Sequence, residues 1–488
     1  MSLRGKIVRG AFWSLVERGG QQGISFIVFM VVARLVGPVE YGLANVCFIV
    51  FTIVNLIILG IVDGIVNLQI DDDDRLSTLF WVLMGIGLAF AGACAVGAGP
   101  LADALHQPRL ADLLREFAAV PVLLATSAVP NMILLKNLDF RIFALRSLAA
   151  SGIGGTVGIF LAFRGIGAHA LVVQQIVLFL TVNLVVWPYA RWRPRLRFCS
   201  AKVFATIFPG LKMTASMLVS VLEQEVPRIL IVFSMSPLML GYYSFVVRVR
   251  YAIQDICVNP PLAVLYPALA QINDRRDEQR AILGLFILAV GFIIFPTLGS
   301  AAVTAPLYMP LVFGHKWDEA IPLLQVFIAC GTVTPFQFIV REILRAHNRL
   351  EAYLRLQIAY VALLLLVIFL LLPHGLMVLG YGTLGVGLFF LPIFFFLLQK
   401  WEGIGLWGEM AKLWAPLAGT ILLVLATLAA AHSAWAPANP WLRLLAALSV
   451  GWVVYLLTCL LLMRREMQQL WAFLRRWRAG RARMDQPQ

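Results

Sequence analysis

Charged residues are scarce in this chain of 488 residues. Asp, Glu, Lys and Arg make up 13% of it, and hydrophobic residues make up 61%. About a quarter of a typical soluble domain is charged. The composition therefore excludes a soluble globular protein and indicates a chain that lies largely within a membrane.

Motifs for nucleotide and metal binding are also missing. No G-x-x-x-x-G-K-[ST] loop occurs, so the sequence offers no site for ATP-driven work. The six cysteines form no C-x-x-C spacing, and no two histidines stand at ligand spacing. The acidic run 71–74 could hold a divalent cation, but on a short loop we interpret it as a solvated charge run. We predict no catalytic residue, no metal site and no cofactor, and hence no enzyme.

Long apolar runs are what the chain does contain. Runs of about 18 or more apolar residues predict membrane-spanning helices. We place fourteen, roughly at 11–34, 41–66, 77–99, 110–135, 142–163, 168–189, 207–233, 238–268, 281–303, 320–344, 352–372, 379–398, 408–431 and 441–463. No A-x-A cleavage site follows the first run, so we interpret it as a span and not as a signal peptide. The predicted fold class is an all-α polytopic membrane protein.

The net charge of +14 is distributed unevenly between the predicted loops. With the N-terminus inside, the cytoplasmic segments hold 25 Lys and Arg residues and the opposite side holds five. Positive residues collect on the cytoplasmic side of membrane proteins. We therefore expect both termini in the cytoplasm, and the basic balance does not indicate a nucleic-acid partner.

The basic stretch after residue 190 divides the chain. We predict an N-lobe of six helices (1–190), a basic cytoplasmic linker (191–203), a C-lobe of six helices (204–400), a terminal helix pair (401–463) and a basic amphipathic tail (464–488). Pro38 with Gly42 recurs as Pro237 with Gly241, at the junction between the first and second helix of each lobe. Both lobes would enter from the cytoplasm, which predicts parallel repeats related by a pseudo-twofold axis along the membrane normal.

The first span carries a polar stripe. Arg18, Gln21, Gln22 and Ser25 stand at i, i+3, i+4 and i+7 and so share one helical face. A Lys or Arg at the bilayer centre costs roughly 2.5–3.5 kcal/mol, so such a face is expected to line a wet or protein-filled interior.

Charged residues inside the spans are the candidate functional residues. The candidates for substrate binding are Arg18, Arg146, Arg228, Arg248 and Arg250, and the candidates for ion coupling or gating are Glu17, Arg34, Glu223, Glu225 and Asp255. If the first helices of the two lobes face each other, these side chains line one central cavity. The alternative is structural: Glu225 with Arg228, and Arg248 with Asp255, stand at spacings that let them simply pair. The sequence leaves this choice open.

Several motifs resemble a known family. The run A-R-L-V-G-P-V-E-Y-G at 33–42 resembles the polysaccharide-transporter branch of the multidrug/oligosaccharidyl-lipid/polysaccharide (MOP) exporter superfamily, and more narrowly its Wzx-type flippases. Matching motifs follow in order at 135–140, 165–171, 240–244 and 313–324. The acidic run 71–74 departs from the family's usual mixed-charge loop.

The resemblance implies a MOP/MATE-like fold and a transport function. The implied cargo is an undecaprenyl-diphosphate-linked oligosaccharide, moved by alternating access from the inner to the outer leaflet of a bacterial inner membrane. The planar fork of arginine suits the phosphate oxygens of such a cargo. Membrane lipids are implied partners, a polysaccharide polymerase and export machinery are further candidates that no residue selects, and H⁺ and Na⁺ both remain open as coupling ions.

Two alternative functions fit some of the same sequence features. A drug or small-ion antiporter of the same superfamily would have the same fold, although several interior arginines argue against a cationic cargo. A membrane polysaccharide polymerase would need a large outside loop or an acidic metal site, and the sequence shows neither.

Overall fold

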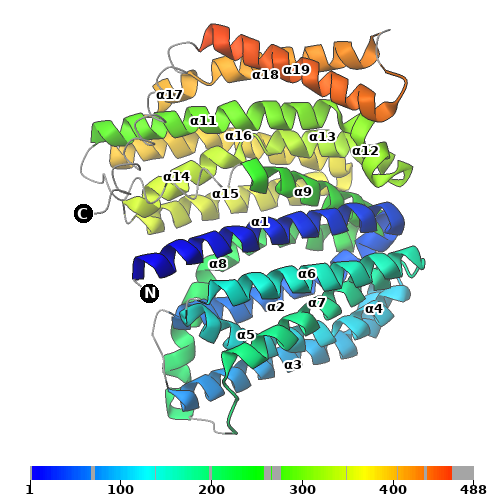
Figure 1. The fold of residues 1–488 in the computed structure, drawn as a ribbon, viewed down its shortest axis with the longest axis vertical. Helices are drawn as coiled ribbons and strands as arrows, with labels where there is room; N and C mark the ends of the chain where they lie inside the picture. Colours follow the sequence, from blue (N-terminus) through cyan, green and yellow to red (C-terminus); the bar gives the residue numbers. More distant parts are fainter. Residues whose placement is uncertain are drawn as a thin grey trace. The chain divides into compact units, whose positions relative to one another are not determined.

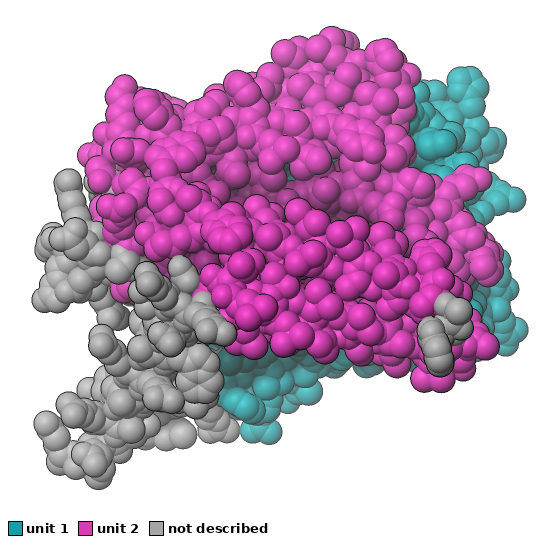
Figure 2. All heavy atoms as spheres, turned by 90° about the horizontal axis from the view of Figure 1, so that it is seen from above, with its two compact units in different colours: residues 1–245 teal, residues 246–488 magenta. Residues whose placement is uncertain are grey.

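The computed structural model describes residues 3–66, 72–137, 139–196, 200–257, 265, 276–347, 349–403, 405–433 and 437–463. Throughout these residues the regular structure is helical, and they contain no β-strand (Figure 1). The predicted all-α class is confirmed. The chain divides into two compact units, residues 1–245 and 246–488 (Figure 2).

The described residues of the first unit form eight helices and the start of a ninth. They are α1 (Leu3–Val36), α2 (Pro38–Val66), α3 (Asp73–Ala104), α4 (Arg109–Phe117), α5 (Ala119–Lys136), α6 (Phe140–Phe163), α7 (Ala168–Ala190), α8 (Ser200–Ser234) and the first turns of α9 (Pro237–Cys257). A single residue, Gly37, separates α1 from α2, and its φ of 87° is a conformation that glycine adopts without strain. The turn between the first two helices is therefore a single residue long.

The second unit contains the rest of α9 and the helices that follow. They are α11 (Arg276–Val303), α12 (Ala305–Phe313), a 3₁₀ helix (His315–Ala320), α13 (Ile321–Cys330), α14 (Thr334–Ala346), α15 (Leu350–Leu371), a 3₁₀ turn (Leu372–His374), α16 (Leu376–Glu402), α17 (Trp407–Ala411), α18 (Trp414–His432) and α19 (Pro440–Leu462). The stretch 304–319, which lies between the predicted spans 281–303 and 320–344, is therefore largely helical.

Twelve of the described helical segments are long and apolar enough to cross a membrane. They correspond to twelve of the fourteen predicted spans. The other two predicted spans, 207–233 and 238–268, begin on α8 and α9, which carry most of the charged candidates. Residues 258–264 and 266–268 of the second of them lie outside the described residues. The total of fourteen stays a prediction. The predicted amphipathic helix in the tail 464–488 lies outside the described residues.

The core of the first unit lies between α2, α3 and α5. Ile58, Leu79, Leu83, Ala125 and Val129 are each at most 1% exposed and belong to one cluster. Lipid tails are as apolar as these side chains, so association of the helices depends on close packing more than on hydrophobicity. This tightly packed group is the scaffold beside which the polar residues of the unit are held.

The basic linker is fastened to the start of α3. The Trp81 indole donates to the carbonyl oxygen of Arg195 at 2.9 Å, the Arg195 amide donates to the Ser77 hydroxyl at 3.0 Å, and the Arg195 guanidinium pairs with Asp73 at 3.2 Å. Asp72 caps α3 by accepting from the Asp74 amide at 3.1 Å. The described part of the acidic run thus caps a helix and anchors the linker. Helix α8 begins at Ser200, within the stretch predicted as linker.

Replacing Trp81 with Phe should loosen this attachment. Phenylalanine keeps an aromatic ring but lacks the indole N–H donor, which leaves the Arg195 carbonyl without that bond and should cost about 0.5–1.5 kcal/mol. Chemical unfolding in detergent micelles would measure the loss, with Trp407→Phe, an exposed indole on α17, as the control. Equal stability of Trp81→Phe and the parent would show that the linker is not held through this bond.

Candidate functional site

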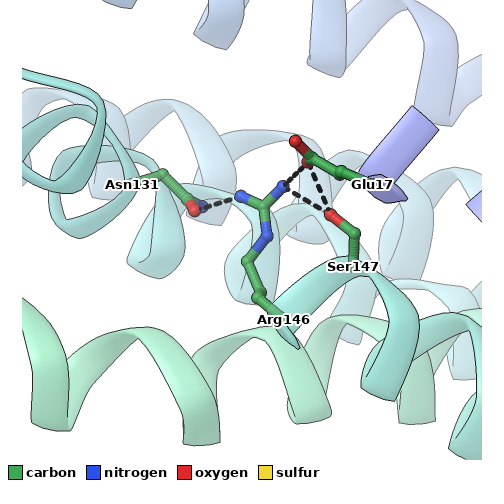
Figure 3. A network of polar contacts seen from close by, with 4 residues as sticks. All are labelled: Glu17, Asn131, Arg146 and Ser147. Atoms are coloured by element: carbon green, nitrogen blue, oxygen red, sulfur yellow. Dashed lines mark hydrogen bonds and ion pairs between the residues drawn. The ribbon is translucent and has the colours of Figure 1, made fainter. Parts of the chain in front are cut away.

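A polar network connects three helices inside the first unit (Figure 3). Arg146 on α6 donates to the Asn131 side-chain oxygen on α5 and to the Ser147 hydroxyl, the latter at 2.9 Å. Its second terminal nitrogen lies 3.4 Å from the Glu17 carboxylate on α1, and Ser147 also donates to Glu17 at 2.8 Å. The network joins α1, α5 and α6 through one guanidinium.

The network lies within membrane-spanning helices. The spans Phe12–Val36, Arg109–Lys136 and Phe140–Phe163 each contribute to it. The side chains of Arg146 and Glu17 are each only 17% exposed, and the Arg146 guanidinium carbon lies 4.5 Å from the centre of the Phe143 ring. A cation in this environment is tolerated because a carboxylate, two polar groups and an aromatic face surround it.

Polar partners from three helices engage the Arg146 guanidinium. Both terminal nitrogens are engaged, and the carboxylate partner is held on a different helix from the arginine. The Nε atom is buried and has no hydrogen-bond partner among the described residues. A guanidinium fork binds phosphate and carboxylate oxygens in the same way. An anion that replaced Glu17 would therefore satisfy the same donors.

A second ion pair lies on α8. The Arg228 guanidinium donates to Glu225 at 2.9 Å, as predicted from their spacing on one helix, and the Glu225 side chain is 5% exposed. Because α2 and α8 pack against each other, this ion pair lies where two helices of the first unit meet.

The remaining predicted residues lie in varied surroundings. Arg18, Arg34 and Arg248 are exposed, whereas Glu223, Arg250 and Asp255 are half-buried. The Arg250 guanidinium lies 4.6 Å from the centre of the Tyr251 ring. On the polar stripe of α1, Gln21 is exposed like Arg18, and Gln22 and Ser25 are half-buried. Because Arg248, Arg250 and Asp255 belong to the second unit, one cavity lined by all the candidates stays a prediction.

Three partners of Arg146 were not among the predicted residues. Asn131, Phe143 and Ser147 form its surroundings together with Glu17. Asn131 carried a usable signal, because an amide within an apolar span needs a polar partner. Ser147 carried none, since a serine in a helix commonly bonds to its own backbone.

A family model described as "Polysaccharide biosynthesis protein" matches residues 31–322. The chain is similar to the lipopolysaccharide biosynthesis protein WzxC of Escherichia coli (strain K12), at 25% identity over 355 residues and 72% of each chain. It is also similar to the succinoglycan biosynthesis transport protein ExoT of Rhizobium meliloti (strain 1021), at 25% identity over 331 residues and 67% of each chain.

Solved structures show the same fold. The lipid II flippase MurJ in an inward closed conformation has a TM-score of 0.76, with 12% identity over 93% of this chain and 99% of that one. A MATE-family multidrug transporter of the MOP superfamily, in an inward-facing conformation, has a TM-score of 0.57. The likeness covers 81% of this chain and 95% of that one, at 14% identity. These likenesses confirm the predicted MOP/MATE-like fold.

Proposed function

The chain belongs to the polysaccharide biosynthesis protein family whose model spans residues 31–322, and we propose that it is a flippase for lipid-linked oligosaccharides. Its cargo is an oligosaccharide repeat unit on undecaprenyl diphosphate, moved from the inner to the outer leaflet of the bacterial inner membrane. The protein is a transporter and not an enzyme. The names of WzxC, ExoT and MurJ support this substrate class.

The observation that carries the proposal is the Glu17–Arg146 pair. An arginine within a membrane span is costly and is usually retained for function. Here its counter-charge comes from α1, a different helix from the one that carries the arginine. An anionic substrate that reached the guanidinium could compete with the Glu17 carboxylate for it.

The mechanism follows from that competition. In the empty protein Glu17 neutralises Arg146. When the diphosphate enters, its oxygens take the place of the carboxylate on the guanidinium fork, and α1 is released from α6. Once the site has opened to the outside, Glu17 pairs with Arg146 again and displaces the diphosphate. No covalent bond changes.

The direction of transport follows from charge. The membrane potential is negative on the cytoplasmic side, so it drives an anionic head group outward. Each charge moved across 100 mV gains about 2.3 kcal/mol. Counter-transport of H⁺ or Na⁺ would add to this force, and Glu17, Glu223, Glu225 and Asp255 remain the candidates as carriers. Polymerase and export proteins remain candidate partners.

The test is the leaflet distribution of lipid-linked glycan in cells that lack this protein. Glycan accessible from outside would be measured with an impermeant glycosidase, after complementation with the parent or with Arg146→Gln. We expect the parent to restore outer-leaflet glycan and Arg146→Gln to restore less than a tenth of it.

The matched control is Arg141→Gln, an exposed arginine on the same helix. It should complement as well as the parent. Normal outer-leaflet glycan in the null strain, with no second transporter of this class in the genome, would disprove the substrate assignment.

A further inference from the structure

Two glycines in the first unit meet backbone to backbone. A Cβ atom placed on Gly42 of α2 would fall on the carbonyl oxygen of Pro237, and one placed on Gly241 of α9 would fall on the carbonyl oxygen of Pro38. Each glycine therefore directs a Cα–H toward the first carbonyl of the other helix, a weak contact that recurs where helices cross closely. No side chain could be added at either position without moving a backbone.

The contact is reciprocal because the two segments are alike. Each helix begins at a proline, Pro38 or Pro237, and carries its glycine four residues later. Proline suits the first position of a helix because it has no N–H to satisfy there. Residues four apart lie one above the other on a helix face. The recurring Pro and Gly found in the sequence thus become the two halves of one crossing, which we call the glycine crossing (Pro38, Gly42, Pro237 and Gly241).

The surroundings of the glycine crossing are apolar and tightly packed. Leu43 and Leu240, which follow and precede the two glycines, are 2% and 1% exposed. The ring centres of Phe29 and Phe245 lie 5.5 Å apart. The cavity beside Pro237, lined by both leucines, has a volume of about 20 Å³, which is room for about one water molecule. A sugar cannot pass here.

We infer that the glycine crossing is the outer gate of the transport path, closed in this structure and separated when the path opens away from the cytoplasm. The inference rests on the proposed transport function. In the predicted topology, both the α1–α2 and the α8–α9 junctions lie on the side opposite the cytoplasm. The contact between the two glycine segments is a weak backbone contact, so separating it leaves no charge without its partner. A buried ion pair such as Glu225–Arg228 could not separate without that cost.

Cysteine accessibility tests the gate without any glycan. In a background with all six native cysteines replaced, Leu43→Cys would be exposed to an impermeant maleimide added to the outside of intact cells. Val39→Cys, at a position that is 44% exposed on the same helix, gives the rate for an open site. We expect Leu43→Cys to react slowly but to completion, because the crossing opens transiently.

Weakening the glycine crossing should speed that reaction. Gly42→Ala and Gly241→Ala each force the backbones apart and should raise the labelling rate of Leu43→Cys at least tenfold. Gly85→Ala on α3, where a Cβ meets nothing within 4 Å, is the matched control and should leave the rate unchanged.

Each other outcome overturns the gate. If the parent stays unlabelled for hours in native membranes, the junction is fixed. The same conclusion follows if the alanine variants no longer accumulate in the membrane. Equal labelling rates in the parent and in well-inserted alanine variants would also refute it. Because labelling requires no substrate, a failed gate leaves the proposed function untouched, and a wrong substrate leaves this result intact.

Discussion

Arg146→Gln is expected to destabilise the protein by about 3–5 kcal/mol and to abolish transport. Removing one partner of a buried pair leaves the other charge uncompensated, and this loss is larger than the net contribution of the intact pair. Here the carboxylate of Glu17, 17% exposed, would be left without its cation. Chemical unfolding in detergent would measure the first effect, and appearance of glycan in the outer leaflet would measure the second.

The double variant Glu17→Gln, Arg146→Gln separates structure from function. With both charges gone, most of the stability should return, because two amides can bond to each other and to Asn131 and Ser147. Transport should remain below a tenth of the parent, since the cation for the diphosphate is missing. A double variant that regains both stability and transport would mean that the pair only holds α1 against α6.

Arg228→Ala is expected to destabilise the protein by a similar amount, and this effect is structural. Glu225 is 5% exposed and accepts from Arg228 at 2.9 Å. Without that donor, a buried carboxylate must be protonated or the α2–α8 packing must open, at about 3–5 kcal/mol. We expect less protein in the membrane and a lower unfolding midpoint in detergent.

The corresponding double variant, Glu225→Ala with Arg228→Ala, should recover much of that stability and also transport. Gln224→Ala, an exposed neighbour on α8, is the control and should behave as the parent. If the double variant is stable but its transport no longer responds to an applied ion gradient, Glu225 carries the coupling ion. In that case the structural interpretation of this pair is wrong.

Local features of the fold and of the site were predictable from the sequence. Apolar runs marked the spanning helices, and the G-P pair at Gly37 and Pro38 marked the first turn. The Glu225–Arg228 pair was predictable too, because residues three apart are neighbours on any α-helix. The family could be recognised because its motifs lie at the helix junctions, where turn geometry restricts the choice of residue.

Contacts between helices were not predictable in this way. Glu17 and Arg146 appeared in the sequence as two separate candidates, and nothing in the spacing of residues 129 apart indicates an ion pair. Lipid-facing and protein-facing surfaces of a membrane helix are both apolar, so hydrophobic pattern does not tell which helices are neighbours.

The sequence by itself determined that this protein is an all-helical membrane protein of a polysaccharide biosynthesis family, since composition, periodicity and junction motifs are local properties of the chain. Only the tertiary structure decided that Glu17 meets Arg146 and that Gly42 meets Gly241, because these contacts depend on which helices pack together and at what depth. It also explained why the proline and glycine recur: two backbones can cross this closely only where neither residue carries a side chain.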